Sequence, residues 1–388
     1  MTGIVNRFRS FKIPEQGIQT MSKKTHSVLL MDSMRVERTY TGGKLLDEWQ
    51  SIHPAKDGLK PEEWIASSTP SRYAPDPTTG LSRIRNDEMK GKFLKDYIAE
   101  DPAGVLGKKH FSEFAENQGF LTKIIDSDKR LNIQTHPDRT QAKILFDSDF
   151  GKSEAWYVMG GRTIDGEEPY ILMGFKPGMT RERWEDLVDK QDITAMEESL
   201  HKVTISKGDV FFIPSGMPHA IGSGSMIAEI QEPTDITFRV EKISHPGKTY
   251  PEETYHQGVG YKKMFDCFDY TTFSKEEVLK KTKVKHITEK TGINSVKTEI
   301  INKDDTPFFS MDRVVIGNSG SWQLDNSMGF ASCVILEGRG TITHLSKTYT
   351  LNRSDEVFLP CSNETYVFHG DEGSELDILF CYPPGRKS

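Results

Sequence analysis

Short apolar stretches separated by turn residues dominate the pattern along the chain. Segments rich in Val, Ile, Phe and Tyr alternate with Gly, Pro, Asn and Asp, as in EAWYVM, PYILMGF, KVTIS, DVFFIP, MIAEIQ and ITFRV. The last hundred residues repeat the pattern with FASCVILEG, GTITH, KTYTLN, EVFLP, TYVFHG and ELDILFCY. Regularly spaced short strands of this kind favour a β-barrel or a β-sandwich. We therefore expect a mostly β protein.

Two stretches instead have helical spacing. Within residues 90–118, apolar side chains such as Phe93 and Tyr97 recur at intervals of three or four. Residues 179–201 contain a second apolar stripe, and Thr180 stands where an N-cap is expected. We expect both stretches to be helical insertions packed on the strands.

One segment recurs in altered form near the C-terminus. GDVFFIPSGMPHAIG, residues 208–222, and RSDEVFLPCSNETYVFHG, residues 353–370, place Asp, Phe and Pro at the same offsets. The first copy has His219 after the turn, whereas the second has Thr365 at that offset. The repeat predicts that both copies keep the architecture and only the first keeps the chemistry.

These patterns predict four regions. Residues 1–26 form a loosely ordered leader, residues 27–245 form an N-terminal β unit with the helical insertions, and residues 292–388 form a second β unit. The intervening residues 246–291, which include a lysine-rich run, are expected to be a solvated helix or a connector.

Charge and composition narrow the function. The chain has 388 residues, a formal net charge of -7 and a pI near 5.9, which argues against binding to nucleic acid or anionic membranes. Its four cysteines are scattered, so no disulfide framework or cysteine zinc site is indicated. Neither an export signal nor a membrane span is recognisable. We therefore expect a cytoplasmic protein.

The spacing around His219 resembles a known motif. Gly208, Pro214, Gly216 and His219 follow the second motif of the cupin superfamily, in which such a histidine joins ligands from an earlier motif on one metal ion. Taken alone, this histidine would more often be a packed core residue.

The earlier motif should offer two ligands one residue apart on a strand and then a glutamate. LNIQTHPDR and GKSEAWYV supply Gln134 and His136, which share a strand face, and Glu154 at the start of the next strand. Superfamily cupins usually have histidine where Gln134 stands.

Together, Gln-x-His-Pro-Asp, Lys-x-Glu and Pro-Ser-Gly-x-x-His resemble the type I mannose-6-phosphate isomerases. FLTKIIDSDKRLNIQTHPD and AEIQEPTDITFRV resemble segments of the same family, and the resemblance extends over about residues 30–240. It implies two cupin (jelly-roll-like) β-barrels, of which the C-terminal one is degenerate. It also implies one zinc ion per chain, with the ligands Gln134, His136, Glu154 and His219.

The same resemblance implies zinc-dependent interconversion of mannose 6-phosphate and fructose 6-phosphate through a cis-enediol. It assigns catalytic roles to Arg239 and Lys152 and substrate contacts to Lys123 and Asn132, and either lysine could be the base. The family usually has serine where Asn132 stands, which leaves the identity of the sugar open. The expected partner is a small sugar phosphate, and the chain is expected to be a monomer or a homodimer.

Three alternatives remain. The protein could be a related isomerase acting on another sugar or sugar phosphate, or a non-catalytic, metal-containing cupin that binds sugars. An oxygen-using iron cupin is a third, although it would be expected to have the usual histidine pair instead of Gln134 and His136.

Overall fold

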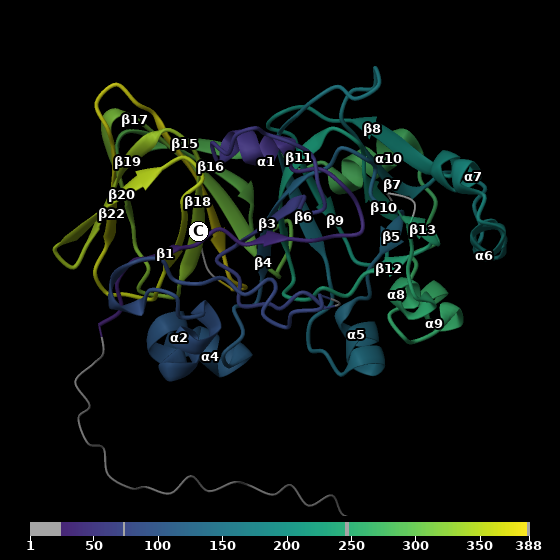
Figure 1. Ribbon diagram of the computed structural model, residues 1–388, viewed down its shortest axis with the longest axis horizontal. Coiled ribbons are helices and arrows are strands. Elements are labelled where there is room, and N and C mark those ends of the chain that lie inside the picture. The colour runs from purple at the N-terminus through teal and green to yellow at the C-terminus, as the bar shows by residue number, and fades with distance from the viewer. Residues whose placement is uncertain (1–24, 73, 245–247, 386–388) are drawn as a thin grey trace, which may run out of the picture.

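The structure of the chain, a computed structural model, describes residues 25–72, 74–244 and 248–385. Most of the predicted leader, residues 1–26, lies outside these described residues. The fold is mostly β, as predicted, and its strands gather into two neighbouring halves (Figure 1).

The N-terminal half contains two antiparallel sheets. The six-stranded sheet has the order β2 (Arg35–Val36), β3 (Glu62–Ile65), β4 (Leu121–Asp126), β11 (Ser225–Gln231), β6 (Glu154–Gly161) and β9 (Val210–Ile213). The five-stranded sheet has the order β12 (Phe238–Arg239), β5 (Gln134–Thr135), β10 (His219–Ile221), β7 (Tyr170–Phe175) and β8 (Leu200–Thr204). Trp156 and Ile227 of the first sheet pack in one buried cluster with Ile171 and Ile221 of the second. The two sheets therefore share a core.

The C-terminal half is one curled sheet (Figure 1). Its strands follow the order β1 (Leu29–Met31), β21 (Glu356–Leu359), β18 (Ala331–Glu337), β23 (Leu376–Tyr382), β17 (Ser310–Leu324), β22 (Tyr366–Gly370), β19 (Arg339–His344) and β20 (Lys347–Asn352). β16 (Ile293–Ile301) pairs with β17, and β15 (Ile287–Thr291) pairs with β16. The strand β1 comes from the other end of the chain and pairs with β21.

Helices occupy the stretches in which the sequence predicts them. Residues 90–118 contain α2 (Leu94–Glu100), α3 (Pro102–Leu106) and α4 (Lys108–Phe114), and residues 179–201 contain α6 (Arg181–Lys190) and α7 (Ile193–Glu198). The Thr180 side chain caps α6 by accepting a hydrogen bond from the Arg183 amide.

The remaining elements are α1 (Lys44–Trp49), the short 3₁₀ helix at Asp87–Met89, α5 (Arg139–Phe146), α8 (Glu252–His256), α9 (Tyr261–Phe265) and a two-stranded ladder of β13 (Ile243–Ser244) and β14 (Lys248–Thr249). Within the described ranges, every helix is too short or too polar to cross a lipid bilayer.

The lysine-rich run, expected to be a solvated helix or a connector, contains a helix that is also packed on the N-terminal half. Residues 275–282 form α10 (Lys275–Thr282), and its Val278 is fully buried in the core of the N-terminal half. Lys283 pairs with Asp209 at 2.6 Å. An apolar stripe within a charged sequence fixes this helix on β9, so it is part of the packed structure.

The two halves meet through a common hydrophobic cluster. Ile124 and Ala228 from the N-terminal sheet pack in the same cluster as Phe330, Phe358 and Leu379 from the C-terminal sheet. Trp49 of α1 donates its indole N–H to the Leu336 carbonyl oxygen at 2.9 Å.

A pair of buried carboxyl groups lies in this junction. Glu63 of β3 and Glu356 of β21 are 0 % and 2 % exposed, and burial followed by the neighbouring Glu63 raises the pKa of Glu356 well above its ordinary value. Glu63 accepts hydrogen bonds from the Ser33 hydroxyl at 2.6 Å, the Gln50 amide at 2.5 Å and the Met34 N–H. Glu356 accepts one from the Ala66 N–H at 3.1 Å. The raised pKa favours the protonated form of Glu356.

Candidate metal centre and substrate pocket

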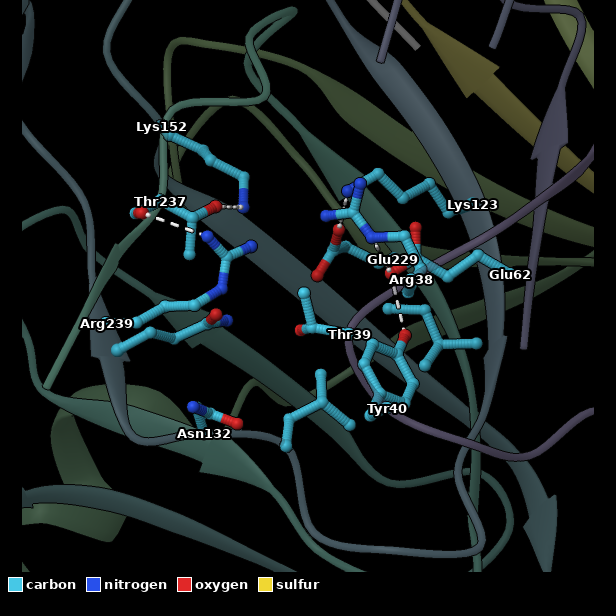
Figure 2. Close-up of a pocket in the computed structure, with 13 residues that line it drawn as sticks. Arg38, Thr39, Tyr40, Glu62, Lys123, Asn132, Lys152, Glu229, Thr237 and Arg239 are labelled. Atoms are coloured by element: carbon cyan, nitrogen blue, oxygen red, sulfur yellow. Dashed lines mark hydrogen bonds and ion pairs between the residues drawn. The ribbon is translucent and has the colours of Figure 1, made fainter. Parts of the chain in front are cut away.

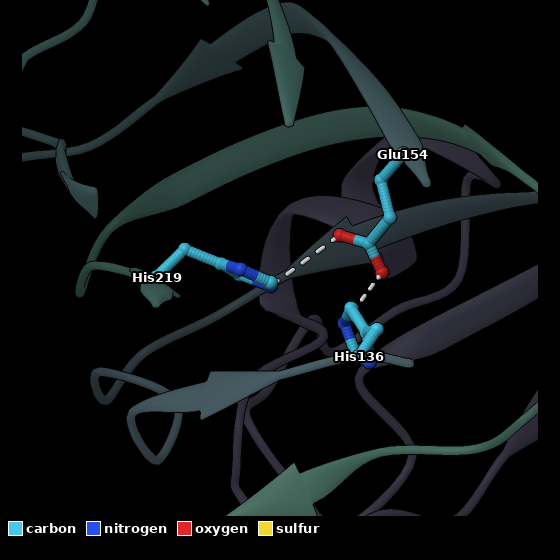
Figure 3. A group of neighbouring side chains, drawn as sticks. All are labelled: His136, Glu154 and His219. Atoms are coloured by element: carbon cyan, nitrogen blue, oxygen red, sulfur yellow. Dashed lines mark ion pairs between the residues drawn. The ribbon is translucent and has the colours of Figure 1, made fainter. Parts of the chain in front are cut away.

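Three of the four predicted metal ligands lie together between the two N-terminal sheets (Figure 3). His136 follows β5, His219 begins β10, and Glu154 begins β6 on the facing sheet. Their candidate ligand atoms all lie within 4.8 Å of one another, and each side chain is at most 1 % exposed. The pairing of His219 with Gln134 sets the register of β10 against β5.

Backbone carbonyls determine which ring nitrogen of each histidine faces Glu154. His136 Nδ1 donates to the Ile236 carbonyl oxygen at 3.0 Å, and His219 Nδ1 donates to the Met217 carbonyl oxygen at 2.8 Å. A carbonyl oxygen only accepts, so each Nδ1 carries a hydrogen.

The opposite nitrogens therefore present lone pairs, and His136 Nε2 also lies 3.3 Å from the Lys152 ammonium. His136 Nε2 lies 3.0 Å from Glu154 Oε1, and His219 Nε2 lies 3.6 Å from Oε2. Burial, followed by the Lys152 ammonium, lowers the pKa of His136 to about 3, and burial lowers the pKa of His219. Two neutral rings thus point lone pairs at a carboxylate. The Lys152 ammonium contacts Glu154 and His136, and two imidazoles beside one carboxylate are a donor set that fits a metal ion.

Gln134 and Lys152 complete the surroundings of this centre. The Gln134 amide nitrogen lies 3.3 Å from His219 Nε2, and a half-turn of the amide would place its oxygen there instead. Lys152 Nζ lies 2.7 Å from Glu154 Oε1 and 3.4 Å from the Thr237 hydroxyl. Burial lowers the pKa of Lys152, although Glu154 opposes the shift.

The centre borders a pocket that contains the other predicted residues (Figure 2). Arg239 lies on β12 opposite Gln134, and its guanidinium donates to the Thr237 carbonyl oxygen at 3.4 Å. Asn132 also lines the pocket and donates its amide N–H to the Glu241 carbonyl oxygen at 3.0 Å. The structure thus places Arg239, Lys152 and Asn132 along one side of the pocket (Figure 2).

The other side of the pocket has a different character. Lys123, 2 % exposed, pairs with Glu229 at 3.2 Å and donates to the Gln231 side-chain oxygen at 2.7 Å. Burial would lower the pKa of Lys123, but Glu229 and then Glu62 outweigh it and raise this pKa. Lys123 therefore remains a cation.

Glu229 is a pocket residue that the sequence prediction missed. Burial and the neighbouring Glu154 raise its pKa to about 7, and its carboxyl accepts a hydrogen bond from the Trp156 indole at 3.1 Å. A group with this pKa can take up or release a proton near neutrality. The available signal was one acidic residue inside the apolar run MIAEIQ.

Arg38, Tyr40 and Glu62 also line the pocket without having been predicted. Arg38 and Tyr40 lie between β2 and β3, and Glu62 begins β3. Charged residues in PEEWI, a strand buried along its whole length, were the sequence signal for Glu62.

These groups suit proton transfer next to a carbonyl. A metal centre and the cations of Lys152 and Arg239 can stabilise negative charge on oxygen, and Glu229 can exchange a proton.

Comparison with known proteins gives a consistent result. Residues 60–154 match the catalytic domain of type I phosphomannose isomerase. The chain is 26% identical over 347 residues to a protein named mannose-6-phosphate isomerase from Streptococcus mutans, with 88% of this chain and 95% of that protein covered. A yeast protein of the same name, from Saccharomyces cerevisiae, is 41% identical over 66 residues, which cover 16% of this chain and 15% of that protein.

The fold is also similar to a solved structure. The crystal structure of mannose 6-phosphate isomerase from Bacillus subtilis superposes with a TM-score of 0.71 at 21% identity, covering 92% of this chain and 100% of that one. The matching segment and the similarity along most of the chain show that this protein is similar to the type I phosphomannose isomerases, and the superposition shows a shared fold.

Proposed function

We propose that the protein is a zinc-dependent isomerase that interconverts mannose 6-phosphate and fructose 6-phosphate. The observation that carries this proposal is the buried group of His136, Glu154 and His219, whose bare ring nitrogens face a carboxylate beside a pocket containing Lys152 and Arg239. The names of the similar proteins support the choice of substrate.

The four proposed metal ligands are Gln134, His136, Glu154 and His219. Two imidazoles, one carboxylate and an amide oxygen are ligands that suit zinc. This set would leave a coordination position for substrate or water. When bound, zinc would act as a Lewis acid toward the oxygen atoms of the sugar.

The reaction transfers a proton between C2 and C1 through a cis-enediol. One group must take the proton from C2 and return it to C1, while the proton on the C2 hydroxyl moves to the oxygen of C1. Lys152 is a better candidate for proton exchange than Lys123, because its pKa is lowered whereas that of Lys123 is raised. Arg239 would stabilise the negative charge that develops on the enediol oxygens.

Lys123 and Asn132 are proposed to contact the substrate. We place the phosphate on the side of Arg239 and Asn132, since Glu62 and Glu229 on the opposite side would repel it. Two such contacts would align the sugar across the pocket, with C1 and C2 next to the metal centre.

We further propose that catalysis is confined to residues 27–245. Residues 246–291 and 292–388 would then support that half through packing, since the metal group and the pocket residues all lie before residue 240. The free cysteines among the described residues suit a reducing compartment, so we propose that the enzyme works in the cytoplasm.

A coupled assay tests the proposed function. Purified protein is given mannose 6-phosphate, and fructose 6-phosphate formation is followed before chelation, after chelation and after zinc is restored. We expect turnover that is lost with the metal and returns with zinc. No turnover by the zinc-replete protein would refute the proposal.

A related isomerase acting on another sugar is the second candidate. Asn132 favours it, because the amide that replaces the usual serine is already engaged by the Glu241 carbonyl oxygen. The same assay with free mannose and other aldose phosphates separates the two. Binding of these sugars without turnover would instead indicate a non-catalytic sugar-binding protein.

A further inference from the structure

The loop that joins β11 to β12 contacts the centre at several points. The Ile236 carbonyl oxygen accepts the hydrogen bond that orients the His136 ring, at 3.0 Å. The next residue, Thr237, lies 3.4 Å from Lys152 through its hydroxyl, and the chain then enters β12 with Arg239. Any shift of this loop would move all of these contacts together.

Asp235, directly before Ile236, is the anchor of the loop. Arg38 donates to both of its carboxylate oxygens at 3.1 Å, Nη1 to Oδ2 and Nη2 to Oδ1. The Arg72 N–H adds a bond at 3.1 Å and the Ser71 hydroxyl another at 3.4 Å. Burial alone would raise the pKa of Asp235, but the Arg38 guanidinium lowers it well below its usual range. Asp235 is therefore a held carboxylate.

Arg38 is held in turn from its other edge. Its Nε lies 3.1 Å from Glu62 Oε1, and Glu62 also accepts hydrogen bonds from Tyr40 at 2.6 Å and from Trp64 at 2.8 Å. The side chains of Arg38, Glu62 and Asp235 are 11%, 3% and 6% exposed. A planar guanidinium thus joins strand β3 to the loop through two carboxylates, a geometry that lysine cannot reproduce.

The loop has a second ion pair at its start, where Glu232 contacts Arg139 at 2.6 Å, but this pair has one contact and the Arg139 side chain is 37% exposed. The Thr234 hydroxyl donates to the Gly151 carbonyl oxygen at 2.9 Å, and the strand that follows, β12, is only two residues long. A buried, bidentate ion pair resists displacement more strongly than these contacts, because breaking it would leave a charge without its partner.

We propose that Arg38 is a positioning residue, whose bidentate contact with Asp235 holds residues 232–237 and thereby orients His136, Lys152 and Arg239 for the reaction. Arg38 is not assigned a catalytic role, because two carboxylates already occupy its guanidinium. The kinetic part of this inference rests on the proposed isomerase function.

The test compares the ion pairs of two arginines, Arg38 and Arg35, that lie in or just after β2. Arg38→Gln, Asp235→Asn and the double variant remove the contact to the loop. Arg35→Gln is the control, since Arg35 of β2 forms a similarly buried ion pair with Asp47 at 3.1 Å, away from the loop. Two quantities are measured: the kcat for mannose 6-phosphate, and amide hydrogen exchange of residues 232–239, which requires no substrate.

We expect each single variant to lower kcat by about 10-fold or more and to speed exchange in the loop. The double variant should be within about 2-fold of the single variants, because both remove the same contact. Arg35→Gln should change neither quantity by more than about 2-fold. Ethylguanidinium should restore part of the activity of Arg38→Ala, whereas it should not help Arg38→Ala combined with Asp235→Ala.

Wild-type exchange and kcat in Arg38→Gln, or equal losses in Arg35→Gln, would overturn the inference. If Arg38→Gln does not fold, Arg38→Lys and Asp235→Asn take its place. Arg38→Lys keeps a positive charge beside Glu62, and Asp235→Asn leaves both Arg38 and Glu62 unchanged. If the wild type itself shows no turnover, the proposed function fails, and the exchange comparison still decides the role of Arg38.

Discussion

The backbone determines the chemistry of the two histidines. Their Nδ1 atoms are bound to the carbonyl oxygens of Ile236 and Met217, so only the Nε2 atoms are available toward Glu154. This arrangement makes each ring a preoriented ligand, and its removal should affect metal binding before anything else.

We expect His219→Ala to weaken zinc binding by at least about 100-fold, because it removes a ligand from a site with three strong donors. Zinc content after dialysis and a competitive chelator titration measure the effect. His201→Ala is the control, since this buried histidine bonds to the Phe273 carbonyl oxygen outside the centre. Unchanged zinc content in His219→Ala would remove this histidine from the ligand set.

Arg239→Ala should keep its zinc and lose turnover by a factor of about 10² to 10³, a magnitude typical of a lost electrostatic contact in the transition state. Steady-state kinetics and metal analysis on the same sample measure both. Arg181→Ala serves as the control, since Arg181 forms an exposed ion pair with Glu185 on α6. Normal kcat in Arg239→Ala would show that the catalytic assignment is wrong.

Sequence motifs made the grouping of His136, Glu154 and His219 beside Arg239 predictable, because spacing along paired strands determines which side chains meet. Glu229, Glu62 and Arg38 could not be found in this way. Each is a single charged residue on a separate strand or loop, and only the three-dimensional packing shows that they face one pocket.

At the scale of elements, the turn between β9 and β10 places His219. Gly216 has a φ of 83° and donates its N–H to the His136 carbonyl oxygen at 2.9 Å, so the turn is tied directly to the other histidine. A positive φ of this kind costs a residue with a Cβ atom more than it costs glycine.

Gly216→Ala should therefore lower the free energy of unfolding by about 1–2 kcal/mol. Urea denaturation measures this change. Gly160→Ala is the matched control, because Gly160 has no positive φ and a Cβ there would meet no atom within 4 Å. Equal stability of the two variants would show that the turn tolerates a side chain.

Local sequence patterns predicted the strands and helices, but they did not predict which strands pair with each other. The helical stripe near Trp184 and the buried strand EAWYVM could be read directly, because periodicity reflects burial. The pairing of β1 with β21 joins residues more than three hundred positions apart, and no local pattern indicates such a contact.

At the scale of the whole molecule, the buried carboxyl group of Glu356 makes the junction sensitive to pH. Burial and the neighbouring Glu63 raise the pKa of Glu356 well above its ordinary value. Between the ordinary and the raised pKa, the folded state holds a proton that the unfolded chain has released.

The contribution of Glu356 to stability should therefore fall as pH rises, by up to about 1.4 kcal/mol per pH unit within that window. Glu356→Gln keeps a hydrogen-bond donor and should lose this dependence. Urea denaturation at about pH 5 and about pH 7 gives the difference between wild type and variant, with the exposed Glu289→Gln as control. Parallel pH profiles for wild type and Glu356→Gln would contradict the raised pKa of Glu356.

The edge position of β1 has a consequence for how the chain is made. Residues 29–31 leave the ribosome more than three hundred residues before their partner, residues 356–359. Until then the first strand has no place to dock, so this pairing must wait until residue 359 has been made. A product that stops short of β21 would expose both that unpaired strand and the shared hydrophobic junction, which marks incomplete chains for aggregation or degradation.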